Sequence, residues 1–272
     1  ASSGIRFSQM YNSARCCPSR AALLTGLNPQ QTGVGHMVST FGQASSIRVP
    51  AYQGYLNETS VTIAEVLKEN GYQTYMSGKW HVGGGYDLTD ASTWTPGDQT
   101  HPTPVQRGFD KFFGTLTGAG NFYNPPTLML ENKFIKVESE NFHYTDEISK
   151  HAVKMIAEKN DVNPFFMYVA FTAPHWPLHA WEEDISKYEG KYRKGWSQLR
   201  MNRYEEMRGS VLDPKWKLTK EDPATPNWND IRHKDWEDLR MATYAAQIEQ
   251  MDRGIGTIID KLKEIGEFDN TV

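Results

Sequence analysis

Apolar residues recur with helical spacing in three parts of the chain. Residues 63–70 carry them on one face, and a glycine follows. A second helix is predicted over residues 145–160, opened by Thr145 with acidic side chains in its first turn. The longest periodic segment runs over about 236–265, and Gly266 is expected to end it. Each pattern predicts a helix with one face packed on a core.

Two short apolar segments between these helices predict strands. One covers residues 72–78, and the other is the near-continuous apolar run within 164–177, a pattern typical of strands buried on both faces of a parallel sheet. The alternation of helix and strand therefore predicts an α/β protein with helices packed on a sheet. Residues 83–108 read as a loop, and residues 181–235 as a surface excursion with short helical pieces rather than a separate domain.

The last residues, FDNTV, follow a helix-ending glycine and resemble the beginning of a strand. The first residues lack an initiating Met and begin in the middle of a pattern. We therefore expect residues 1–272 to be part of one larger catalytic domain, with a first strand before them and a C-terminal part after them. No apolar run is long enough for a membrane span, and the opening residues do not resemble a signal peptide.

The number and distribution of charged residues bear on which partners the protein binds. The 272 residues carry a formal net charge of -4, and the 29 Lys and Arg side chains are spread along the chain apart from a cluster within 187–208. A nucleic-acid partner is not expected, because the basic footprint that binds a polyanion is missing.

The only two cysteines, Cys16 and Cys17, are adjacent. Neighbouring residues cannot form an ordinary disulfide without strain, so the pair is not a structural cross-link. A redox or soft-metal site is an alternative, but a zinc or iron–sulfur site needs further thiol ligands, and the sequence has none.

The segment CCPSRAALLTG, residues 16–26, contains the pattern Cys-x-Pro-Ser-Arg-x-x-x-Leu-Thr-Gly. It resembles the signature of the type I, formylglycine-dependent sulfatases (arylsulfatases) of the alkaline-phosphatase-like superfamily. The segments SGKWHVG, RGFDKFFG and TAPHWPLH follow in the order seen in that family. The resemblance covers most of the chain and implies an alkaline-phosphatase-like α/β fold, with a large, mostly parallel or mixed sheet between helices.

The resemblance implies a sulfuric ester hydrolase that cleaves an aryl or carbohydrate sulfate monoester to an alcohol and inorganic sulfate. In the family, the first cysteine of the signature, here Cys16, is oxidised by a formylglycine-generating enzyme to Cα-formylglycine. The hydrated aldehyde has two hydroxyls. One attacks sulfur, and deprotonation of the other expels sulfate, so the covalent intermediate need not be hydrolysed directly.

The resemblance also implies roles for four further residues. Arg20, one helical turn after Cys16, stabilises the formylglycine and its alkoxide, since its guanidinium can reach back along the helix. Lys79 binds the sulfate, and His81, two residues later, assists elimination as a base. His175 follows the second predicted strand, contacts the sulfate and protonates the leaving oxygen.

The family uses a divalent cation, usually Ca²⁺, which prefers oxygen ligands. The resemblance makes Cys16, as formylglycine, one ligand and implies that the Asp and Asn ligands lie outside residues 1–272. Because members of the family are usually periplasmic, secreted or lysosomal, the resemblance implies one of these locations.

Two alternative functions remain: a phosphonate or phosphate monoester hydrolase of the same superfamily, and a non-catalytic sulfate-binding module that keeps a free thiol at Cys16. Because the nearby prolines exclude a regular helix, His179 is expected to be a loop contact or a residue that lines the substrate site. A structural role is favoured for His36. Residues 181–208 are aromatic and basic, and are either a solvated insertion or a sugar-lining surface.

Overall fold

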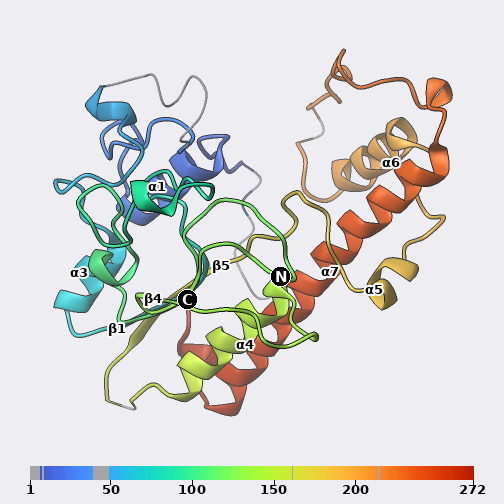
Figure 1. Ribbon diagram of the computed structural model, residues 1–272. Helices are drawn as coiled ribbons and strands as arrows, with labels where there is room; N and C mark the ends of the chain where they lie inside the picture. Colours follow the sequence, from blue (N-terminus) through green and yellow to red (C-terminus); the bar gives the residue numbers. More distant parts are fainter. Residues whose placement is uncertain (1–6, 8, 39–48, 161, 214) are drawn as a thin grey trace. The chain divides into compact units, whose positions relative to one another are not determined.

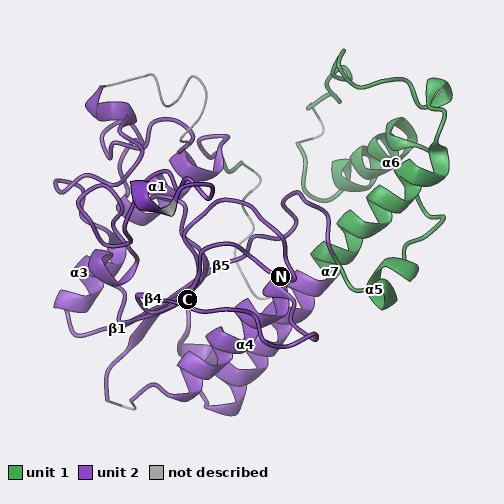
Figure 2. Ribbon diagram, in the orientation of Figure 1, with its two compact units in different colours: residues 1–11, 180–249 green, residues 12–179, 250–272 purple. Residues whose placement is uncertain are grey.

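The computed structural model describes residues 7, 9–38, 49–160, 162–213 and 215–272. The chain divides into two compact units (Figure 2). The sheet unit comprises residues 12–179 and 250–272, and the helical unit comprises residues 180–249 with the described part of residues 1–11. The expected surface excursion, residues 181–235, therefore lies in a compact unit that also includes residues 236–249 of the predicted long helix.

The sheet unit contains a five-stranded mixed sheet of order β4-β3-β2-β1-β5 (Figure 1). β1 lies parallel to both β2 and β5, whereas β3 lies antiparallel to β2 and β4. The strands are β1 (Gln73–Lys79), β2 (Lys111–Thr115), β3 (Leu128–Leu130), β4 (Lys133–Phe134) and β5 (Phe165–Ala170). This arrangement confirms the predicted α/β class and both predicted strands.

Helices precede, connect and follow the strands. Those of the sheet unit are α1 (Cys16–Thr25), α3 (Ile63–Glu69) and α4 (Tyr144–Ala157), with the short 3₁₀ turns η1 (Pro50–Tyr52), η2 (Ala91–Thr93), η3 (Val105–Arg107) and η5 (Phe268–Asn270). The helical unit contains α5 (Glu182–Ser186), α6 (Trp196–Arg208) and η4 (Trp228–Asp230). The long α7 (Lys234–Glu264) contributes residues 234–249 to the helical unit and residues 250–264 to the sheet unit.

The side chains of β1 alternate between two cores, as a strand buried on both faces requires. Met76 packs in one cluster with residues of α1 and α3, whereas Tyr75 packs in the other with residues of α4. Met251, from α7, packs against the second cluster. The sheet is therefore covered by α1 and α3 on one face and by α4 on the other.

Helix boundaries follow local capping chemistry. Thr62 accepts from the Glu65 amide and Glu65 from the Thr62 amide, a capping box that begins α3. α4 spans Tyr144–Ala157, where residues 145–160 were predicted, and its N-cap is His143, two residues before Thr145, because the His143 ring nitrogen accepts the Thr145 amide at 3.3 Å. Gly266, with a φ of 76°, follows α7 as predicted.

Two strand expectations differ from the structure. Phe165–Val169 of β5 are half-buried rather than buried, because β5 is an edge strand of the sheet formed by the described residues. The segment after Gly266 forms the turn η5 instead of beginning a strand, and the Thr271 amide donates to the Phe268 carbonyl. No strand of the described residues pairs with this segment, so its backbone groups bond locally.

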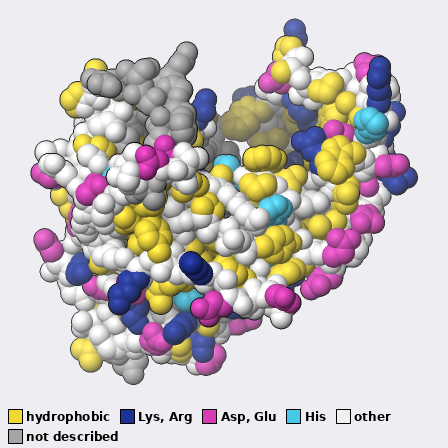
Figure 3. Space-filling view, viewed as in Figure 1, with side chains coloured by type: hydrophobic (Ala, Val, Ile, Leu, Met, Phe, Trp, Pro, Cys, Tyr) yellow, Lys and Arg dark blue, Asp and Glu magenta, His cyan; other side chains and the backbone are white. Residues whose placement is uncertain are grey.

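Acidic and basic side chains are interspersed on the face drawn in Figure 3 rather than separated into fields of one sign. Among the described residues, no helix is both long and apolar enough to cross a membrane.

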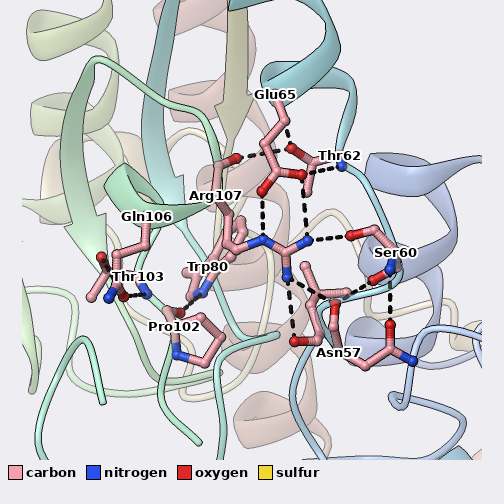
Figure 4. A network of polar contacts seen from close by, with 10 residues as sticks. Asn57, Ser60, Thr62, Glu65, Trp80, Pro102, Thr103, Gln106 and Arg107 are labelled. Carbon is pink, nitrogen blue, oxygen red and sulfur yellow. Dashed lines mark hydrogen bonds and ion pairs between the residues drawn. The ribbon is translucent and has the colours of Figure 1, made fainter. Parts of the chain in front are cut away.

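A buried arginine fastens the loop that precedes β2 (Figure 4). Arg107, 8% exposed, contacts Glu65 Oε1 through Nε at 2.7 Å and donates to the Ser60 carbonyl. Beside it, wholly buried Trp80 donates from Nε1 to the Pro102 carbonyl at 2.8 Å. Trp80 separates Lys79 from His81, so this packing fixes the backbone from which both candidate site residues project.

Candidate active site

The site begins at the first turn of α1. Cys16 is the first helical residue and is half-buried, whereas Cys17 is completely buried. The N-cap residue, Arg15, provides no side-chain hydrogen bond to the helix. The free amide groups of this first turn create a local preference for negative charge at Cys16.

Arg20 connects α1 to two strands. One of its terminal nitrogens, Nη1, donates to the Lys79 carbonyl at 2.6 Å and to the Tyr168 hydroxyl at 3.0 Å. Lys79 ends β1, and Tyr168 lies in the neighbouring β5. The guanidinium therefore holds the Cys16 helix against the carboxyl end of β1, and this end is where parallel sheets place their ligands.

Lys79 is a buried cation. Only 2% of it is exposed, and no carboxylate of the described residues pairs with it. Burial, and next the nearby Arg20 charge, lower the pKa of Lys79 to about 8, although Cys16 acts in the opposite direction. An ammonium group held in this way gains stability from an anion that enters the site.

His81 reaches the same group of side chains from a strained backbone. Its φ is 57°, a left-handed value that is uncommon outside glycine, and it is 8% exposed. Its Nε2 lies 3.4 Å from Cys17 Sγ. Gly118 packs directly on the ring, where a Cβ would collide with it. Burial lowers the pKa of His81, which favours the neutral imidazole that a base requires.

The surroundings shift the pKa values of the two thiols in opposite directions. A hydrogen bond with Cys17 is the largest of the effects that lower the pKa of Cys16, and His81 and Lys79 act in the same direction. The hydrogen bond with Cys16, followed by burial, raises the pKa of Cys17. Position 16 is thus the one at which the surroundings stabilise an anion.

The loop that follows β5 carries two further histidines, His175 and His179. His175 is exposed in the loop after β5, and its Nδ1 lies 2.5 Å from the Trp176 carbonyl. Within the described ranges, no hydrogen bond joins it to Cys16, Lys79 or His81, so its role at the leaving group stays a prediction. His179 accepts the Phe122 amide at 3.3 Å, as a loop contact would.

Two hollows border the site. An open one of about 380 Å³ lies over Cys16 and is lined in part by Arg15, Arg20 and Tyr168. A second, of about 290 Å³, lies on the side of His81 and is lined in part by Tyr86, Thr117 and Gly118. Substrate groups can therefore approach the site from solvent without opening the core.

The side chains around Cys16 differ from the oxygen ligands that Ca²⁺ prefers. The His, Cys, Asp and Glu side chains of the described residues that gather there are Cys16, Cys17 and His81. Sulfur and imidazole do not suit Ca²⁺, which prefers six to eight oxygens. The described residues therefore do not fit this ion, and the expected oxygen ligands remain a prediction.

Sequence reasoning missed three residues of the site. Met37 Sδ lies 3.5 Å from Cys16 Sγ, Tyr168 binds Arg20, and Gly118 makes room for His81. Of the three, Tyr168 could most readily have been predicted from the sequence, because a hydroxyl inside an apolar strand needs a hydrogen-bond partner. Met37 and Gly118 lie in loops that carry no comparable signal.

Comparison with known proteins gives these residues a context. The family model described as Sulfatase matches residues 1–272, and the chain belongs to the sulfatase family. It is 33% identical over 296 residues to an uncharacterised sulfatase of Schizosaccharomyces pombe, covering 100% of this chain and 50% of that protein. It is 31% identical over 289 residues to an arylsulfatase of Klebsiella aerogenes, covering 100% of this chain and 58% of the relative.

A solved structure of similar fold is Ps i-CgsB in complex with k-i-k-neocarrahexaose. It superposes with a TM-score of 0.60 at 25% identity, covering 94% of this chain and 46% of that one. These comparisons confirm the alkaline-phosphatase-like fold expected from the signature. The chain spans about half the length of the relatives it matches.

Proposed function

We propose that the protein hydrolyses sulfate monoesters of phenols or carbohydrates, with Cys16 converted to formylglycine. The observation that carries the proposal is the buried Lys79 ammonium beside Cys16, which no carboxylate of the described residues neutralises. A sulfate ester supplies the missing negative charge. The arylsulfatase relative supports the sulfate class, and the oligosaccharide in the neighbouring structure supports a carbohydrate as the alcohol.

The position of Cys16 suits the modified residue. Its side chain is half-buried and borders the open hollow, so both a maturing enzyme and a substrate can reach it. When present, the hydrated aldehyde supplies an oxygen nucleophile in place of sulfur.

The other residues supply charge and proton transfer. Lys79 binds the sulfate oxygens and offsets their charge as the bond to the leaving oxygen breaks. Arg20 holds the helix of Cys16 against the Lys79 backbone, and its charge stabilises the formylglycine and its alkoxide, as the signature implies. His81, neutral because it is buried, accepts a proton from a hydroxyl at position 16. His175, exposed in the loop after β5, protonates the leaving oxygen.

The test is turnover of an aryl sulfate, an aryl phosphonate and an aryl phosphate by the full-length, matured protein. The proposal predicts the highest kcat/KM for the sulfate, and loss of that activity in Cys16→Ala. Preference for the phosphonate or phosphate would favour the alternative hydrolase. Sulfate binding without any turnover would favour the non-catalytic module.

A further inference from the structure

We propose that, as long as Cys16 remains a thiol, the side chains of Cys16, Cys17, Met37 and His81 form a binding site for a soft monovalent cation of the Cu(I) class. This inference concerns the unconverted protein and holds whether or not the proposed catalytic function is correct. The sequence offered only two thiols for such a site. The structure adds a thioether and an imidazole from loops distant in sequence.

The four donor atoms already lie near the separations that one ion requires. Cys17 Sγ is 3.4 Å from His81 Nε2, and Met37 Sδ is 3.5 Å from Cys16 Sγ and 3.9 Å from Cys17 Sγ. The two thiol sulfurs and a ring nitrogen lie within 4.8 Å of one another. An ion about 2.3 Å from sulfur and about 2.0 Å from nitrogen places tetrahedral ligands roughly 3.5 to 3.8 Å apart. A small movement of the half-buried Cys16 side chain brings all four donor atoms within bonding distance of one ion.

A disulfide does not compete for the same sulfurs. Adjacent residues have Cα atoms about 3.8 Å apart, which is below the usual range for a bridge. Cys17 is instead held as a ligand would be, since the Val38 amide donates to its Sγ at 3.3 Å. An N–H group directed at sulfur stabilises a thiolate.

The donors and the local charge select the kind of ion. Thiolates and a thioether are soft donors that favour Cu(I), whereas hard cations prefer oxygen. The buried Lys79 ammonium and the Arg20 guanidinium act on the same group of side chains. Binding of the ion displaces the protons of both thiols, which leave to solvent. The two thiolates with a monovalent cation then keep a net negative charge, which these neighbours stabilise. A divalent cation would leave the donor set neutral beside two positive charges.

An ion can reach the four donor atoms from the solvent-facing side of the site. Cys17 and His81 are buried, but Cys16 and Met37 are half-buried and Cys16 borders the open hollow. An ion bound here occupies the sulfur at position 16. One consequence rests on the proposed function: metal loading would withhold Cys16 from the maturing enzyme.

The test uses the protein produced without a maturing enzyme, with the thiol at position 16 verified by peptide mass. Cu(I) is titrated anaerobically in competition with the chromophoric chelator bicinchoninate. We expect one ion per chain, about 100-fold weaker binding in Cys17→Ala and about 10-fold weaker binding in Met37→Leu. Met37→Leu keeps the shape of the side chain, so it tests the thioether even if Cys17→Ala disturbs the core.

Two variants serve as matched controls: Met201→Leu and His36→Ala, at an exposed methionine and an exposed histidine. Both should bind Cu(I) as the unchanged protein does. Equal affinity in the unchanged protein, Cys17→Ala and Met37→Leu would overturn the proposal. It would equally be overturned if the controls weakened binding as much as the two site variants.

Discussion

The Arg20 guanidinium donates to the backbone carbonyl of Lys79 at 2.6 Å, so the helix that presents Cys16 is fastened directly to the residue expected to bind sulfate. The backbone of Lys79 thus accepts a hydrogen bond from one residue of the site, while its side chain is the proposed sulfate-binding group. The contact holds a charged residue of the first helix against the sheet, although the Arg20 charge, together with burial, lowers the pKa of Lys79.

Arg20→Met should lower kcat/KM for an aryl sulfate by about 100-fold, because it removes the donor of both hydrogen bonds, to the Lys79 carbonyl and to the Tyr168 hydroxyl. Tyr168→Phe removes only one of the two acceptors of Arg20 and should cost less than about 10-fold. Measuring kcat/KM for both variants compares the hydrogen bond of Arg20 to the Lys79 carbonyl with that to the Tyr168 hydroxyl. Equal losses would mean that the contact with Tyr168, rather than that with Lys79, positions the helix.

Gly118→Ala should displace the His81 ring, since the added Cβ would overlap it. We expect a lower kcat/KM and a loss of roughly 1–3 kcal/mol in the free energy of unfolding. Gly256→Ala is the matched control, because Gly256 lies within α7 and no atom stands near its added Cβ. That variant should be as stable as the parent or up to about 1 kcal/mol more stable. An active Gly118→Ala enzyme would show that the ring position is not critical.

His151 stacks on Phe113 with a ring-centroid distance of 3.6 Å, and burial lowers its pKa. The unfolded chain therefore binds more protons, so this stabilising effect is present near neutral pH and is lost as the pH falls below about 6.5. His151→Phe should reduce the loss of stability between pH 7.5 and 5.5, measured by urea unfolding. His151→Gln should show the same reduced pH dependence but lower stability, since it keeps no ring. An unchanged pH dependence in both variants would contradict the assignment.

Arg107→Met should lower the free energy of unfolding by about 3–5 kcal/mol, because it breaks a largely buried ion pair and leaves Glu65 and several carbonyls without their donor. The ion pair between Lys111 and Glu158 is exposed to solvent. Glu158→Gln should therefore leave the free energy of unfolding nearly unchanged. Comparable effects in the two variants would show that burial of the Arg107 network is not what makes it stabilising.

The sequence predicted the parts of the fold that repeat with a simple period. The three helices and the strands around residues 73–79 and 165–170 were found because their apolar residues alternate or recur along one face. The start of α4 was missed by one residue because the histidine that caps it is not among the usual capping residues. The turn after Gly266 was missed because a strand depends on a neighbour with which to pair.

The candidate site was predicted in part. Cys16, Arg20, Lys79 and His81 do lie together, since the signature places two of them on one helix and the end of β1 supplies the others. His175 is exposed, and no hydrogen bond among the described residues joins it to these side chains, so its role stays a prediction. The contact between Met37 and Cys16 joins a loop to a helix and depends on tertiary packing that no local pattern reports.

The central claim is that Cys16 becomes the catalytic nucleophile. The most direct measurement is the mass of the tryptic peptide spanning residues 16–20, from the full-length protein isolated from its own host. An aldehyde or its hydrate at Cys16, with Cys17 still a thiol, is the predicted result. Two unmodified thiols, in a host whose maturing enzyme is shown to be active, would contradict the account.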